Sequence, residues 1–109
     1  MPKFLMLYRS SDGAEDRMNN SAPEDMQDSM QAWIDWKDQV ETSFKFEFGM
    51  PLQIRQHFGA AGSESDVSGY STIEGDDMDG LHKAIAMHPH LSEQGASIDV
   101  LEMLPMPGM

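Results

Sequence analysis

The sequence predicts an α+β fold in which strands and helices follow the order β-α-β-β-α-β. A continuous apolar run at residues 4–8 is typical of a central strand. Apolar residues at helical spacing follow over 21–43. Strand patterns then come before and after a second, shorter helical pattern. This order predicts a ferredoxin-like, four-stranded antiparallel sheet with both helices on one face.

The first helix has the clearest pattern. Ser21-Ala22-Pro23-Glu24 fits a capping box, with Ser21 as N-cap, and the helix is expected to end at about Ser43. At 100° per residue, six apolar side chains share one stripe and Trp36 lies at its edge. The six are Met26, Met30, Trp33, Ile34, Val40 and Phe44.

The middle strands are predicted from alternation and turn residues. Gly49-Met50-Pro51 indicates a turn, and apolar and polar residues then alternate over 52–58. Residues 59–66 are small and polar, which is typical of a hairpin loop. The next strand is expected at 67–74.

The second helix should begin at an aspartate cap and end before a proline. Asp76 or Asp77 is the predicted cap, and Pro89 cannot continue the helix. The last strand is expected at 97–103, before a Pro-rich tail.

Composition limits the classes of function. The chain has 109 residues, which suits a single domain over 1–109, and its formal net charge is −12. Without a basic cluster, binding to nucleic acid or to an anionic membrane is not expected. The absence of cysteine excludes disulfides and thiolate chemistry. The N-terminal apolar run is too short for a signal peptide or a membrane span, so we expect a cytoplasmic protein.

The first strand also predicts assembly. It is apolar on both faces, whereas two helices cover only one face of the sheet. We therefore expect a homodimer that buries the open sheet face.

Several stretches, in order over nearly the whole chain, carry a family resemblance: Lys3-Phe4-Leu5-Met6-Leu7-Tyr8-Arg9, Trp33-Ile34-Asp35-Trp36, Gly69-Tyr70 with Ile73-Glu74, His88-Pro89-His90-Leu91, and 97–103 with 106–109. The sequence resembles the YCII-related family in its DGPF-type branch. His88 stands where that family usually has Cys, and the Asp-Gly-Pro-Phe signature is absent. The resemblance implies a dimeric α+β barrel, with a His–carboxylate pair suggested as an active site. Most members are uncharacterised.

His90 and Glu102 are the candidate catalytic residues. His90 follows a helix-ending proline, and a neutral imidazole can take or give a proton at cellular pH. The alternative is that His90 bonds a nearby backbone carbonyl and shapes the turn. Glu102 shares a strand face with apolar residues, so it either lines a pocket or lies at an edge. In the first case it would orient His90.

The candidate substrate-binding residues are Tyr8, Trp33, Trp36 and Lys37. The aromatic residues form either a pocket wall or core. Lys37 lies within the apolar stripe, where it is a pocket cation, a side chain that reaches solvent, or the partner of Glu41 in an ion pair.

The remaining histidines and motifs add little. His57 should face solvent, and His88-x-His90 resembles a metal chelate only weakly because Pro89 breaks the helix. No nucleotide-binding or nucleophile motif occurs, so no cofactor and no metal is expected.

Three functions remain open. The first is a small-molecule pocket protein, with its pocket between the sheet and the first helix. It would perform an isomerisation or elimination on a small aromatic or carbonyl compound, with His90 as the base. The second is a non-catalytic dimer that binds a ligand or a protein. The third, by fold analogy alone, is an oxygenase without heme or metal.

Overall fold

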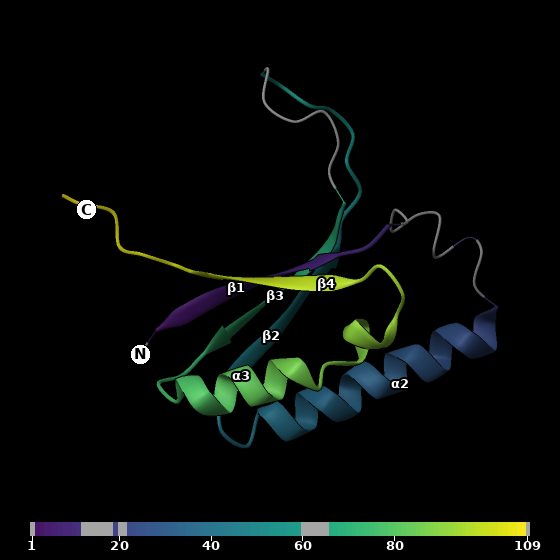
Figure 1. Cartoon of the computed structure of the whole chain (residues 1–109), viewed down its shortest axis with the longest axis horizontal. Helices are drawn as coiled ribbons and strands as arrows, with labels where there is room; N and C mark the ends of the chain where they lie inside the picture. Colours follow the sequence, from purple (N-terminus) through teal and green to yellow (C-terminus); the bar gives the residue numbers. More distant parts are fainter. Residues whose placement is uncertain (1, 12–18, 20–21, 60–65, 109) are drawn as a thin grey trace.

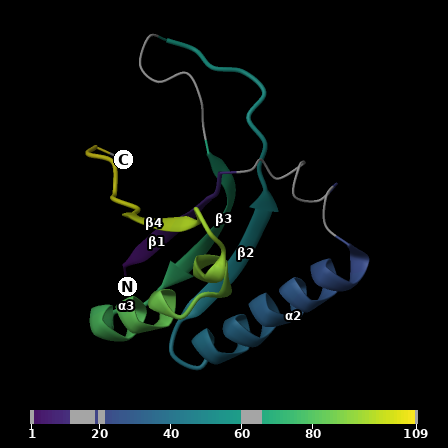
Figure 2. The ribbon, with the colours of Figure 1, turned by 45° about the vertical axis from the view of Figure 1, so that its right-hand side comes forward.

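The computed structural model describes residues 2–11, 19, 22–59 and 66–108. Its elements are β1 (Lys3–Arg9), α2 (Pro23–Val40), β2 (Lys45–Pro51), β3 (Val67–Glu74), α3 (Met78–Ala86), the 3-10 helix η1 (Pro89–Ser92) and β4 (Ser97–Glu102). The strands form a four-stranded antiparallel sheet in the order β2-β3-β1-β4. Helices α2 and α3 lie side by side on one face of it (Figures 1 and 2). The fold is ferredoxin-like α+β, as predicted.

Strand β1 occupies the predicted central position, between β3 and β4. Its side chains alternate: Phe4, Met6 and Tyr8 are buried toward the helices. Leu5 and Leu7, on the opposite face, are half-buried. The strand is therefore fully buried on only one face within this chain.

Helix α2 begins and ends differently from the prediction. Its N-cap is Ala22, which makes no side-chain capping bond, and Pro23 is the first helical residue. The predicted cap, Ser21, lies outside the described residues. The helix ends at Val40 rather than near Ser43. Pro23 favours this start because its fixed φ suits the first turn and its missing N–H costs nothing there.

The buried side of α2 is narrower than the predicted stripe. Trp36, predicted at the edge, is buried with Val40. Met26, Met30 and Ile34 are instead 41%, 62% and 38% exposed. Figure 1 shows the reason, because the N-terminal half of α2 extends past the sheet, so only its C-terminal half has a sheet to cover.

The second strand was predicted in the wrong place. Residues 52–58 form no strand, and β2 lies at Lys45–Pro51 instead, with Phe46 buried in the core. Gly49, which suggested a turn, is a strand residue. A Cβ on Gly49 would lie 2.3 Å from the Tyr70 ring, so any other residue at this strand position would have to displace that ring.

The second helix and the last strand follow the prediction closely. The Asp77 side chain caps α3 by accepting the Gly80 N–H at 3.0 Å. Helix α3 ends at Ala86, before Pro89. Strand β4 covers Ser97–Glu102.

Gly75, between β3 and α3, provides a test of packing. A Cβ there would lie 2.3 Å from the ring of buried Phe44. We expect Gly75→Ala to lower the free energy of unfolding by about 1–2 kcal/mol, because the ring must shift. Urea denaturation measures this, and Phe44→Leu in the same chain should relieve part of the loss. Equal losses in both backgrounds would contradict the proposed overlap.

Candidate active site

Five ring side chains meet between the sheet and α2, and we call them the ring cluster: Tyr8, Trp33, Trp36, His88 and His90. The His88 ring lies 4.3 Å from Trp36 and 4.5 Å from Trp33, measured between ring centroids. Tyr8 lies 4.8 Å from Trp33 and 5.3 Å from His90. All are buried except Trp33, which is half-buried. Four of the predicted site residues are thus brought together, and His88 joins them.

Local structure explains how the cluster forms. Tyr8 points toward the helices because it alternates with Leu7 and Arg9 on β1. Trp33 and Trp36 are three residues apart on α2, so they lie on the same side of the helix. Pro89 starts η1, whose N-cap is His88. The short turn between α3 and β4 therefore directs both histidines against Tyr8.

A chain of hydrogen bonds fixes the state of His88. Its Nδ1 accepts the backbone N–H of His90 at 3.0 Å, so the neutral ring carries its proton on Nε2. This Nε2–H donates to the Tyr8 hydroxyl at 3.2 Å, and the Tyr8 O–H donates to Ser71 Oγ at 2.9 Å. The tautomer of His88 thus follows from its backbone contact, and the Tyr8 hydroxyl accepts from His88 and donates to Ser71.

Burial keeps this chain uncharged at neutral pH. Burial and, to a smaller extent, the neighbouring His90 lower the pKa of His88 to about 3. Burial also raises the pKa of Tyr8 to about 12, against the opposing effect of its hydrogen bond with Ser71. Neither group is therefore a ready proton donor or acceptor near neutrality.

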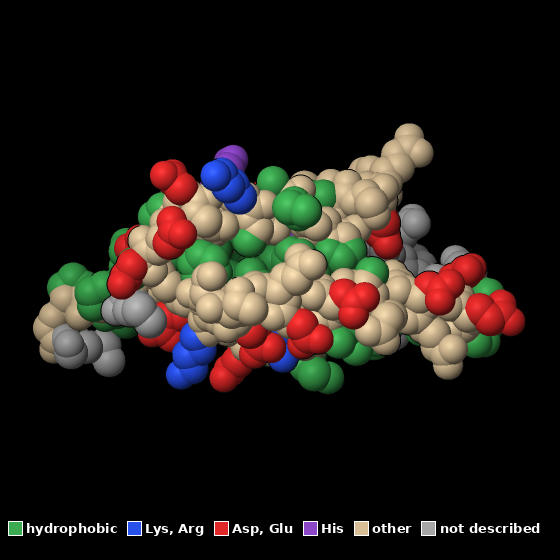
Figure 3. Space-filling model, turned by 90° about the horizontal axis from the view of Figure 1, so that it is seen from below, with side chains coloured by type: hydrophobic (Ala, Val, Ile, Leu, Met, Phe, Trp, Pro, Cys, Tyr) green, Lys and Arg blue, Asp and Glu red, His purple; other side chains and the backbone are tan. Residues whose placement is uncertain are grey.

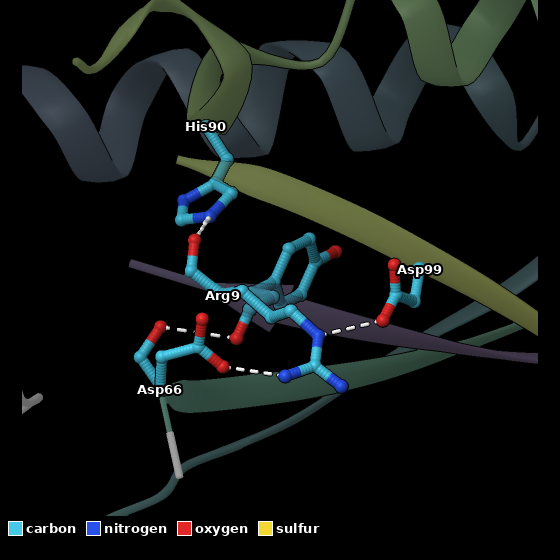
Figure 4. Close-up of polar contacts among 6 residues, drawn as sticks. Arg9, Asp66, His90 and Asp99 are labelled. Atoms are coloured by element: carbon cyan, nitrogen blue, oxygen red, sulfur yellow. Dashed lines mark hydrogen bonds and ion pairs between the residues drawn. The ribbon is translucent and has the colours of Figure 1, made fainter. Parts of the chain in front are cut away.

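His90 bonds a main-chain carbonyl rather than a carboxylate. Its Nε2 lies 2.8 Å from the Arg9 carbonyl oxygen (Figure 4). A carbonyl only accepts, so Nε2 carries a proton, and in the neutral ring Nδ1 then keeps the lone pair. In the ring contact that the structure shows, the partner of His90 is therefore a carbonyl and not the predicted carboxylate.

Glu102 lies far from His90. It is exposed on β4 opposite Phe4, near one end of β1, whereas His90 bonds Arg9 at the other end. The two contacts are about 17 Å apart along β1 at about 3.3 Å per residue. This exposure is what the edge alternative predicts for Glu102.

Lys37 and His57 also lie outside the cluster. The Lys37 ammonium forms an i,i+4 ion pair with Glu41 at 2.6 Å, one of the predicted alternatives. His57 is exposed, as predicted, although its segment is not a strand.

The two clustered histidines are not arranged as a chelate. Their ring centroids are 6.5 Å apart and their planes are nearly perpendicular. The nitrogens of His88 are engaged by His90 N–H and by Tyr8. Among the described residues, no group of three or more His, Asp or Glu side chains is placed to hold a metal ion.

A cavity of about 230 Å³ lies between α2 and α3. Figure 3 shows the green hydrophobic side chains along this seam. Its lining includes Trp36, which also contacts His88, but not Tyr8, Trp33 or His90. This cavity is therefore not the predicted one between the sheet and α2.

His88 and Ser71 were missed as parts of a site. His88 was noted only as a turn residue and weak chelate, because the contact with Tyr8 spans 80 residues of sequence. Ser71 did give a signal, since alternation places it on the same strand face as Ile73, and the structure buries it fully.

No family model and no curated protein matches the chain. The chain is similar in structure to 5-chloro-2-hydroxyhydroquinone dehydrochlorinase (TftG) from Burkholderia phenoliruptrix, solved in complex with 2,5-dihydroxybenzoquinone. The TM-score is 0.50 and the sequence identity 17%, over 97% of this chain and 95% of that one. At this identity the similarity shows the fold alone. In the described part of the chain, no helix is long and apolar enough to cross a membrane.

Proposed function

We propose that this protein is an enzyme of the lyase or isomerase type that acts on a small aromatic or carbonyl ring compound at the ring cluster. The observation that carries the proposal is the pair of buried imidazoles enclosed by Tyr8, Trp33 and Trp36. Aromatic side chains favour planar ligands by stacking or edge contacts. The similar structure named above, a dehydrochlorinase of a chlorinated hydroquinone, supports this choice of substrate class.

In this proposal His90 is the acid/base group. With Nε2–H directed at the Arg9 carbonyl, Nδ1 presents its lone pair to a substrate proton. Proton removal leaves an electron pair that forms a new double bond as a leaving group departs, or as the proton returns elsewhere. The carbonyl then stabilises the imidazolium in the orienting role predicted for a carboxylate.

The other cluster residues bind and orient in this scheme. His88 stays neutral because of its low pKa and holds the Tyr8 hydroxyl by its Nε2–H. Trp33 is half-buried and lies 6.1 Å from Phe48, which is 37% exposed, so substrate would enter beside these rings. Lys37 and Glu102 have no part in it.

A binding and turnover experiment tests the proposal. With 2,5-dihydroxybenzoquinone as probe, we expect calorimetry to detect saturable binding, which Trp33→Ala weakens about tenfold through lost ring contacts. His90→Ala should bind the probe but abolish turnover of halogenated hydroquinones. His57→Ala is the matched control, since His57 is exposed and outside the cluster. Unchanged turnover in His90→Ala would remove His90 as the acid/base group.

The second candidate is a non-catalytic binding module with structural histidines. The bond from His90 to the Arg9 carbonyl favours it, because this contact alone would shape the turn. Full activity loss in His90→Ala with an unchanged unfolding free energy would argue against this candidate.

We also propose that the protein is a homodimer. The half-buried Leu5 and Leu7 lie on the sheet face opposite to the helices, and a second copy would cover them. Sedimentation equilibrium should show a dimer at micromolar concentration, and Leu7→Lys should shift it to monomer. A wild-type monomer would overturn this assignment.

A further inference from the structure

The Arg9 side chain is held between two carboxylates from different strands. Its Nε lies 2.6 Å from Asp99 Oδ2 on β4, and its Nη1 lies 2.5 Å from Asp66 Oδ1, next to the start of β3 (Figure 4). β3 and β4 are the two neighbours of β1. We call Arg9, Asp66 and Asp99 the arginine clamp, because it ties three adjacent chain segments together.

The clamp lies where the sheet is irregular. The register between β1 and β3 shifts between Tyr8 and Arg9, so the regular ladder of backbone bonds is interrupted there. Just beyond, the Ser10 N–H donates to the Asp66 carbonyl at 2.9 Å. Asp66 therefore holds both the Arg9 side chain and the next peptide of the same strand. The clamp therefore supports the backbone at the position where the regular hydrogen bonds between β1 and β3 are interrupted.

This backbone carries the Tyr8 ring and, one residue further, the carbonyl that His90 bonds. The Tyr8 side chain points toward the helices, whereas the Arg9 side chain extends to the clamp. The Arg9 carbonyl accepts the His90 Nε2–H at 2.8 Å. Rotation of the peptide that follows Arg9 would move the acceptor of His90, whereas the Tyr8 hydroxyl stays bonded to Ser71.

We infer that Arg9 is a positioning residue: its clamp sets the carbonyl that fixes the tautomer and orientation of His90. The importance of this position for catalysis rests on the proposed function, but the positioning itself does not. The clamp carboxylates of Asp66 and Asp99 are 54% and 50% exposed, so these ion pairs should contribute little to overall stability. We expect the clamp to affect the local geometry of the Arg9 carbonyl and His90 instead.

The test measures the His90 ring proton directly. We expect Arg9→Met to accelerate solvent exchange of the His90 Nε2 proton by about tenfold in NMR, because local opening becomes easier. The double variant Asp66→Asn/Asp99→Asn should do the same, and Arg9→Lys, which keeps one ion pair, should give an intermediate rate. Lys83→Met, which removes an exposed cation from α3, is the control and should leave the rate unchanged.

Two further results distinguish a positioning role of Arg9 from a surface ion pair that has no effect on His90. The His88 Nε2 proton should keep its exchange rate in Arg9→Met, since its partner is the Tyr8 hydroxyl, which Ser71 also holds. If the His90 proton also exchanges at the wild-type rate, Arg9 forms only a surface ion pair and the inference is overturned. Because this measurement needs no substrate, a clamp effect without any turnover would refute the proposed function and leave the positioning role intact.

Discussion

Replacement of Trp36 by alanine should lower the free energy of unfolding by about 3–5 kcal/mol, the largest effect that we expect from a single change. Trp36 is 6% exposed and packs against Phe46 and His88, with ring centroids 5.1 and 4.3 Å away. Its indole N–H also donates to the Ala84 carbonyl at 2.8 Å, which joins α2 to α3. Urea denaturation followed by circular dichroism measures the loss.

Two other tryptophan variants make the result interpretable. Trp33→Ala should cost less than Trp36→Ala because Trp33 is only half-buried. Trp36→Phe keeps a ring and loses the hydrogen bond to Ala84, so about 1–2 kcal/mol is expected. If Trp33→Ala were the more damaging change, Trp33 and not Trp36 would make the larger packing contribution within the ring cluster.

Acid should destabilise the protein through His88. Burial lowers its pKa from 6.5 to about 3, so the unfolded chain binds this proton more readily than the folded chain. The stability contributed by neutral His88 is therefore complete above pH 6.5 and falls as the pH drops toward 3. Between pH 7.5 and 4.5 this single group should remove about 2–3 kcal/mol.

A variant without the titrating ring isolates this effect from the many carboxylates. His88→Gln keeps a neutral polar side chain of similar reach. Between pH 7.5 and 4.5, the free energy of unfolding of this variant should fall by about 2–3 kcal/mol less than that of the wild type. Denaturant melts at several pH values compare the two slopes. Parallel curves for wild type and variant would mean that His88 is protonated in the folded state, and the neutral hydrogen-bond chain to Tyr8 would then be wrong.

The elements predicted correctly are those in which local signals and burial agree. The run at 4–8 is central in the sheet, residues 67–74 form β3, and Asp77 and Pro89 bracket α3. The second strand was predicted wrongly because a residue that resembled a turn signal is there for a tertiary contact. Gly49 resembled a turn residue, but its lack of a side chain makes room for the Tyr70 ring across the strands.

The sequence by itself determined the ferredoxin-like order of elements, the formal net charge of −12, and four members of the ring cluster. Only the tertiary structure decided which groups meet. Periodicity places a side chain on a face, but not at a position along a neighbouring strand, so the separation of Glu102 from His90 was not visible. For the same reason, a backbone carbonyl 81 residues away became the partner of His90, since every residue carries one and only the fold selects it.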